Sequence, residues 1–163
     1  MTEFLAITFA GGIVGALFMD VAESVSARAG ITSGVNVALV GRWAGSLARG
    51  VFHHRDIRDM PAQRCEIAVG WLFHLFIGGG AVALALPLGW QVVTGSLPGA
   101  EPWPYLLFGL ATSALPWFIL LPSFGWGLWG RNGPEGRALL ASVLSHIPYG
   151  LGIWVTLALA YPL

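Results

Sequence analysis

The stretch Ile13-Val-Gly-Ala-Leu-Phe-Met-Asp20-Val-Ala-Glu23 places two carboxylates inside a long apolar run. The run covers about residues 4–28, and before Asp20 its most polar member is Thr8. A mostly apolar run of about 20 residues is long enough to cross a bilayer as a helix. We therefore predict a membrane-spanning helix over residues 4–28, with the two carboxylates in its second half.

Asp20 and Glu23 are three residues apart, so on a helix they lie on one face, about one turn from each other. An ionisable side chain at this depth costs at least about 2.5–3.5 kcal/mol and normally faces the protein interior or a wet cavity. The pair is therefore the starting point for a functional site. A simpler alternative, stronger for Glu23 because it lies close to Arg28, is a side chain that reaches the headgroups.

The composition is that of an integral membrane protein. Of the 163 residues, 56% are hydrophobic and 10% are charged, and the mean hydropathy is +0.73, whereas soluble domains have about 25% charged residues. We expect a single membrane domain over residues 1–163. The chain has no lysine, and its eight basic residues are all arginine; we expect no nucleic-acid partner. The lone Cys65 has no partner for an internal disulfide.

The apolar segments predict an all-α, four-helix membrane bundle with spans over about 4–28, 67–88, 103–127 and 137–161. The connection over 29–66 carries five arginines, and the one over 128–136 carries Arg131. The connection over 89–102 has Glu101 as its one charge. By the positive-inside rule, the arginine-bearing connections are cytoplasmic and both termini are outside. For a bacterial protein this means the inner membrane, with periplasmic termini.

The first connection contains a further amphipathic helix. From Ser33 as the predicted N-cap, apolar residues recur at three- and four-residue steps as far as Val51. We interpret this segment as a short helix in the cytoplasmic interface. The polar segment that follows contains His53 and His54, which we interpret as part of a solvated turn rather than a metal site, because adjacent loop residues are poorly placed to share one ion. In the third span, Pro116 predicts a kink that frees backbone carbonyls.

Three polar side chains are predicted at one depth in the bundle. Asp20, His74 and His146 each lie eight or nine residues from the cytoplasmic end of their span, or about 12–14 Å along a helix. Glu23 lies about one turn nearer the cytoplasm. Three chemical roles fit this set: metal binding by Asp20, His74 and His146; acid–base catalysis by Asp20, Glu23, His74 and His146 on a lipid-soluble substrate; and a proton or ion relay. The structural alternative is a set of histidine–carboxylate hydrogen bonds that hold the helices together.

Several segments along the chain form a recognisable set of motifs: Ala38-Leu-Val-Gly41-Arg42-Trp43, Arg49-Gly-Val-Phe-His53, Glu66, Gly70-Trp71-x-x-His74-x-x-Ile77-Gly78, Leu121-Pro122-x-x-Gly125 and Ser142-x-x-x-His146-x-x-x-Gly150-Leu-Gly152. In these segments the chain resembles the small bacterial membrane proteins grouped as domain of unknown function family 2938. The resemblance implies an integral membrane architecture and no assigned activity. One departure is Arg131-Asn132-Gly133-Pro134, where such proteins often carry a Ser/Thr-Pro-Asn-Pro turn.

Three functional hypotheses follow. The first is a membrane-embedded enzyme or binding protein that uses Asp20, Glu23, His74 and His146 toward a divalent metal, a cofactor or a lipid-soluble substrate. The second is an accessory subunit that packs against a larger membrane complex or against copies of itself. The third is a proton-coupled small transporter, which four spans accommodate poorly unless the protein oligomerises. In all three, the bilayer is the surrounding medium.

Overall fold

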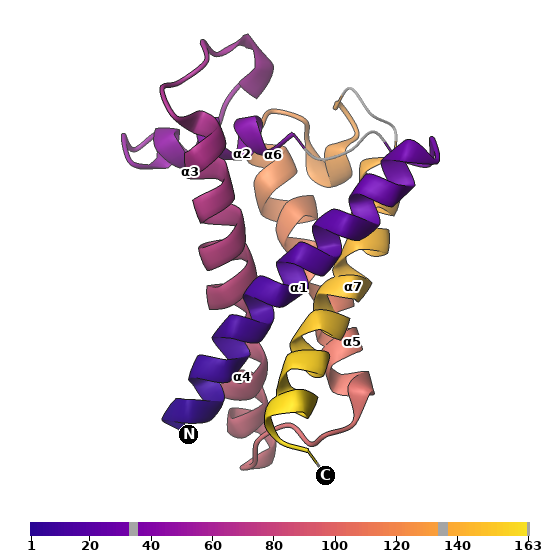
Figure 1. Ribbon diagram of the computed structural model, residues 1–163. Helices are drawn as coiled ribbons and strands as arrows, with labels where there is room; N and C mark the ends of the chain where they lie inside the picture. The colour runs from indigo at the N-terminus through magenta and orange to yellow at the C-terminus, as the bar shows by residue number, and fades with distance from the viewer. Residues whose placement is uncertain (33–35, 134–136, 163) are drawn as a thin grey trace.

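The computed structural model describes residues 1–32, 36–133 and 137–162. Within them, four helices are long and apolar enough to cross a membrane: Thr2–Arg28, Glu66–Thr94, Pro102–Ser123 and Ala138–Ala160. The predicted four-helix architecture is confirmed (Figure 1). The second span continues to Thr94, past the predicted end near residue 88, and the third ends at Ser123, before the predicted residue 127. The ends differ because hydropathy indicates which residues favour lipid, whereas a helix ends where its backbone hydrogen bonds stop.

The first and fourth spans are continuous helices, α1 (Thr2–Arg28) and α7 (Ala138–Ala160). The second and third spans are interrupted. The second consists of α3 (Glu66–Leu72), the π-helix η2 (Phe73–Ala81) and α4 (Ala85–Thr94). The third consists of α5 (Pro102–Thr112), the π-helix η3 (Pro116–Leu120) and α6 (Leu121–Ser123). Short elements outside the spans are α2 (Val37–Leu47) and the 3₁₀ turns η1 (Ile57–Asp59) and η4 (Leu128–Gly130).

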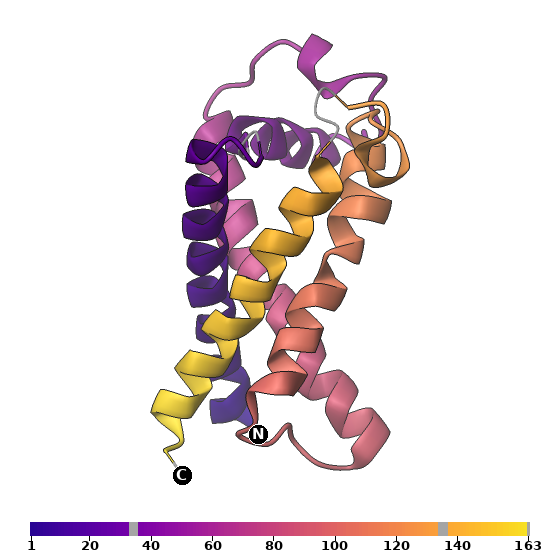
Figure 2. The same cartoon turned by 90° about the vertical axis from the view of Figure 1, so that its right-hand side faces the viewer.

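The helix α1 lies between two neighbours: it packs against α7 along its length and against η2 of the second span (Figure 1). On the far side of α7, α5 completes the bundle, and α2 packs against α3. In Figure 2, α2 lies across one end of the bundle instead of running along it. The helix α1 therefore contacts both the second and the fourth span.

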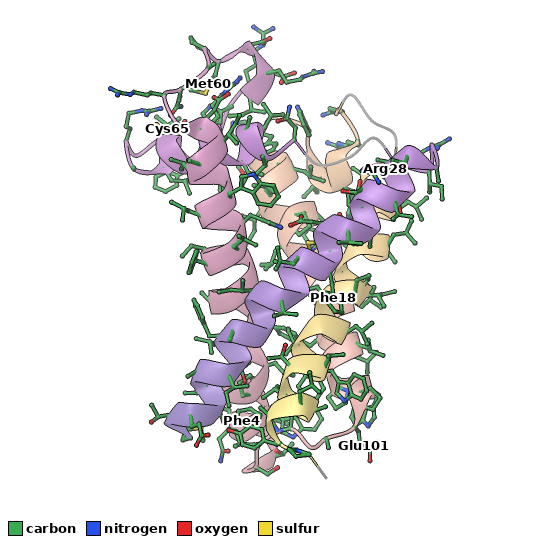
Figure 3. All side chains as sticks on the ribbon, in the orientation of Figure 1. Phe4, Phe18, Arg28, Met60, Cys65 and Glu101 are labelled. Carbon is green, nitrogen blue, oxygen red and sulfur yellow. The ribbon has the colours of Figure 1, made fainter. Side chains whose placement is uncertain are left out.

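All eight arginines lie at one end of the bundle, which we call the arginine end. It contains the last turn of α1, the first turns of α3 and α7, and the loops between them. Figure 3 labels Arg28 and Cys65 at this end and Phe4 and Glu101 at the opposite end. The segregation of arginines agrees with the charge distribution that the sequence predicts.

Two clusters of buried side chains hold the bundle together. One lies toward the end opposite the arginines and is made of Ala83, Leu86, Tyr105, Tyr149, Ile153 and Leu157. The other lies at the arginine end and is made of Leu39, Val40, Trp43, Ile57 and Phe124. The second cluster shows that the apolar face of α2 is buried against the protein's own loops and third span, which joins the first connection firmly to the bundle.

The start of α2 differs from the predicted one. The helix begins at Val37 and ends at Leu47, short of Val51. Its N-cap is Asn36, whose side-chain oxygen accepts a hydrogen bond from the Ala38 amide at 3.1 Å. The predicted N-cap, Ser33, lies outside the described residues. Asn and Ser are about equally good N-caps, so sequence preference alone does not choose between them.

The loop that contains His53 and His54 is docked on the third span. The His54 amide donates to the Ser123 carbonyl at 2.9 Å, and the Ile57 amide donates to the Phe124 carbonyl at 2.9 Å. The interpretation of a solvated turn is correct for His53, which is exposed, and wrong for His54, which is buried. Burial lowers the pKa of His54, and nearby His53 and Arg49 lower it further. His54 is buried because these two backbone hydrogen bonds hold its part of the loop against the end of the third span.

Pro116 begins the π-helix η3. Proline has no N–H to donate, and its ring excludes the carbonyl of the preceding turn. The predicted local disturbance at Pro116 therefore takes the form of a wider helical turn. A π-helical segment is uncommon and often lies at a functional site.

Candidate functional site

The central contact of the candidate site joins Asp20 on α1 to His74 on η2. The imidazole Nε2 and the carboxylate Oδ1 are 3.0 Å apart, and the residues are 54 positions apart in sequence. With an ionised Asp20, the Nε2–H donates and the carboxylate accepts. Two of the three polar groups predicted at one depth thus meet directly between the first two spans.

A regular face of α1 brings these side chains together. Gly12, Ala16 and Asp20 follow at four-residue steps, so they lie along one side of the helix. A Cβ on Gly12 would overlap the Gly79 carbonyl, and a Cβ on Gly79 would lie 3.0 Å from that of Ala16. This backbone contact sets the spacing of α1 and η2, and one turn farther on Asp20 reaches His74.

The site is only partly enclosed. The side chains of His74 and Asp20 are 20% and 23% exposed, whereas Glu23, one turn closer to the arginine end, is 5% exposed. Two of its oxygens, Asp20 Oδ2 and Glu23 Oε2, are buried and have no hydrogen-bond partner among the described residues. A buried acceptor without a donor costs about 1–3 kcal/mol. These two oxygens are the feature of the site that a function must explain.

The π-helical turn shapes the His74 side of the site. His74 is the second residue of η2, and the indole of Trp71 lies beside its ring, with centroids 6.0 Å apart. Because Nε2 faces Asp20, the other ring nitrogen of a neutral His74, Nδ1, is an acceptor. The pair therefore holds one imidazole in a defined tautomer inside an apolar bundle.

His146 does not join the pair by a hydrogen bond. Its Nδ1 is 2.7 Å from the Ser142 carbonyl on the preceding turn of α7. A carbonyl accepts only, so Nδ1 carries the proton and Nε2 of a neutral ring is an acceptor. Within the described chain, neither carboxylate is hydrogen-bonded to His146. Asp20 and His74 are therefore hydrogen-bonded to each other, whereas His146 is hydrogen-bonded within its own helix, α7.

The described residues contain no group of three or more His, Cys, Asp or Glu side chains that could hold a metal ion. The described residues therefore give no support to the hypothesis that Asp20, His74 and His146 bind a metal ion.

One buried polar group, the indole N–H of Trp117, was not identified from the sequence. Trp117 lies on η3 of the third span, and its indole Nε1 is buried without a hydrogen-bond partner among the described residues. Tryptophan is usually a hydrophobic or interfacial residue in a membrane helix, so its type alone gave no signal. Its position directly after Pro116 was the available clue.

A second polar network, also missed, ties α2 to the start of the second span. Arg42 Nε and Nη2 donate to the two oxygens of Glu66 at 2.9 and 3.0 Å, and Arg42 Nη1 donates to the carbonyls of Ile57 and Met60. The Gln63 amide donates to Glu66 at 2.8 Å. Glu66 thus joins α2 to the start of the second span at the arginine end.

Four helices of membrane-spanning length around a carboxylate–imidazole pair define a polytopic helical membrane protein with a polar site inside its bundle. The chain belongs to the family described as Protein of unknown function (DUF2938), whose model matches residues 9–160. This confirms the resemblance drawn from the sequence motifs. Neither the curated proteins nor the solved structures include a match to the chain. The family assigns no activity, so the function has to be argued from the site.

Proposed function

We propose that Asp20, Glu23 and His74 form a membrane-embedded binding site for a lipid-soluble molecule that donates hydrogen bonds, through a hydroxyl or an amine. The observation that supports it is the pair of buried acceptors, Asp20 Oδ2 and Glu23 Oε2, which lack donors among the described residues beside an already formed Asp20–His74 bond. A bound donor satisfies them where lipid supplies no water. The partial exposure of Asp20 and His74 leaves the pair reachable.

The same contacts support a second form of this proposal, in which the site catalyses proton transfer on the bound molecule. Asp20 orients His74 through Nε2, so Nδ1 is the ring nitrogen that accepts a proton from a bound hydroxyl. Glu23 lies on the same face of α1, one turn away, and is the second carboxylate of the site. His146, with Nε2 as its acceptor, is the remaining member of the predicted catalytic set. Binding is the primary proposal, and catalysis is a further step for the same residues.

The test is to extract the purified protein with organic solvent and identify co-purifying small molecules by mass spectrometry. We expect a near-stoichiometric compound with a hydroxyl or amine group, reduced about tenfold or more in Asp20→Asn and His74→Ala, because each change removes about 1–3 kcal/mol of charge-assisted hydrogen bonding. Asp59→Asn is the matched control, since Asp59 is an exposed carboxylate in the loop at the arginine end. Its content should equal that of the wild type.

Probe binding gives an independent readout. Fluorescence titration with 2-naphthol, which has a donor, should give saturable binding that Asp20→Asn abolishes, and 2-methoxynaphthalene, which has none, should bind at least about tenfold more weakly. A wild type that is empty on extraction and does not distinguish the two probes would contradict the proposal and favour a structural role for the pair. Release in a larger particle would favour the accessory subunit. Proton uptake by vesicles that depends on Asp20 would favour the transporter.

We further propose that the arginine end faces the cytoplasm of a bacterium, which places both termini in the periplasm. The support is the positive-inside rule, because every arginine lies at that end. Cys65 is the single cysteine and is exposed there. A membrane-impermeant maleimide should therefore label Cys65 in inverted vesicles and leave it unlabelled in intact spheroplasts. Cys65→Ser is the control for background labelling, and labelling of spheroplasts would reverse the orientation.

A further inference from the structure

We infer that the corner between α2 and α3 binds the headgroup of an anionic phospholipid, with Arg49 and Arg64 as the residues that meet its phosphate. The corner combines two exposed cations with exposed apolar residues on α3. This surface is separate from the Asp20–His74 site and does not depend on its proposed function.

Among the described residues, no carboxylate neutralises the charge of Arg49 or Arg64. Arg49 Nη1 donates to Gln63 Oε1 at 3.2 Å and Nη2 donates to Ser46 Oγ at 3.3 Å, so neutral acceptors hold its guanidinium in place. Arg64 directly follows Gln63 in the chain and is exposed. In the described part of the chain, neither arginine lies within ion-pair distance of a carboxylate.

Two carboxylates at the arginine end, Glu66 and Asp56, are already paired with other arginines. Glu66 accepts two hydrogen bonds from Arg42, and Asp56 is paired with Arg58. Arg58 holds the pKa of Asp56 well below its usual range, which keeps that carboxylate charged and engaged. The positive charge of Arg49 and Arg64 is therefore left to attract an anion from outside.

The apolar part of the corner fits an acyl chain. Ile67 is 59% exposed and Trp71, one turn farther into the membrane, is 40% exposed. They are four residues apart, so they form one strip of α3. Tryptophan is favoured where headgroups meet acyl chains. A guanidinium binds phosphate through two parallel hydrogen bonds, and at this level of a bilayer the available phosphates belong to lipid headgroups.

Native mass spectrometry of the detergent-purified protein tests this inference. The probes are a phosphatidylglycerol and a phosphatidylcholine of the same acyl chains, with free glycerol phosphate as the soluble source of phosphate. We expect one phosphatidylglycerol per chain to bind most tightly. In Arg49→Gln/Arg64→Gln its affinity should fall about 25-fold, since each arginine at an anionic surface contributes about fivefold. The double variant Arg55→Gln/Arg131→Gln removes the same charge elsewhere at the arginine end. Its affinity for phosphatidylglycerol should fall much less.

Two further results separate specific binding from its alternatives. Arg49→Lys/Arg64→Lys keeps both charges but loses the paired guanidinium hydrogen bonds, so its affinity should lie between those of the wild type and of Arg49→Gln/Arg64→Gln. Equal losses in the two glutamine double variants would overturn the inference in favour of diffuse attraction. Phosphatidylcholine binding as tightly as phosphatidylglycerol would overturn it as well. Competition by millimolar glycerol phosphate would assign the corner to soluble anions instead of lipid.

Discussion

Gly150→Ala should cost at least about 3 kcal/mol of stability, near the top of the range for overpacking. Gly150 lies in the middle of α7, where a Cβ would overlap the Tyr105 carbonyl oxygen and approach the Leu106 Cα to 3.0 Å. Both obstacles are backbone atoms of α5, so no side-chain rotation relieves the overlap. The two helices have to separate along their whole contact, which also includes Gly109 opposite Gly150.

The measurement is unfolding of the purified protein in mild detergent, followed by circular dichroism or by loss of the folded peak in size exclusion. Gly89→Ala is the matched control because Gly89 is also helical, in α4, and its Cβ would meet no atom within 4 Å. Alanine there should stabilise by about 0.5–1 kcal/mol through lower backbone entropy in the unfolded chain. Similar effects of the two substitutions would show that α5 and α7 are not in backbone contact.

Arg42→Ala should cost about 3 kcal/mol because it strips Glu66 of its partner at the start of the second span. The side chains of Arg42 and Glu66 are 11% and 13% exposed, and two hydrogen bonds join them. Glu66 also holds the pKa of Arg42 above its usual value, chiefly through the hydrogen bond between their side chains. Removing one partner of a buried ion pair leaves an uncompensated charge, and that loss is larger than the net contribution of the pair.

The double variant Arg42→Met/Glu66→Leu checks this reasoning. Because it removes both charges, it should be more stable than either single alanine variant, and the coupling between the two sites should be about 1–3 kcal/mol. Arg58→Ala serves as the control, since the Arg58 side chain that pairs with Asp56 is 47% exposed; exposed ion pairs contribute little. The same unfolding assay applies. Additive effects of the two single variants would contradict a coupled, buried pair.

The sequence was informative wherever the cost of burial is large. Carboxylates in an apolar run must face protein rather than lipid, and Asp20 does so by bonding to His74. The spans were predictable for the same reason, since about 20 apolar residues have few other stable environments. The arginine end followed from charge alone. The sequence did not determine the N-cap of α2, because two residues that cap helices about equally well, Ser33 and Asn36, lie close together.

What the sequence could not resolve was which polar groups meet. His74 and His146 are the same residue type at the same predicted depth, yet the first bonds to Asp20 and the second to the Ser142 carbonyl. Which histidine bonds to Asp20 depends on the rotation of α1 about its own axis. Gly12 and Ala16 direct one face of α1 toward η2, whereas Gly15 lies against Tyr149 of α7. Asp20 belongs to the face that meets η2, and a rotation of this kind leaves no trace in composition or hydropathy.

The sequence by itself therefore determined the class of the protein, its four spans, the clustering of arginine at one end and the presence of a buried carboxylate site, because each follows from the transfer of chemical groups between water and lipid. The tertiary structure alone decided the Asp20–His74 pairing, the Arg42–Glu66 network and which oxygens of Asp20 and Glu23 have no partner among the described residues. These depend on ångström-scale contacts between helices, which are set by where glycine lets two backbones touch.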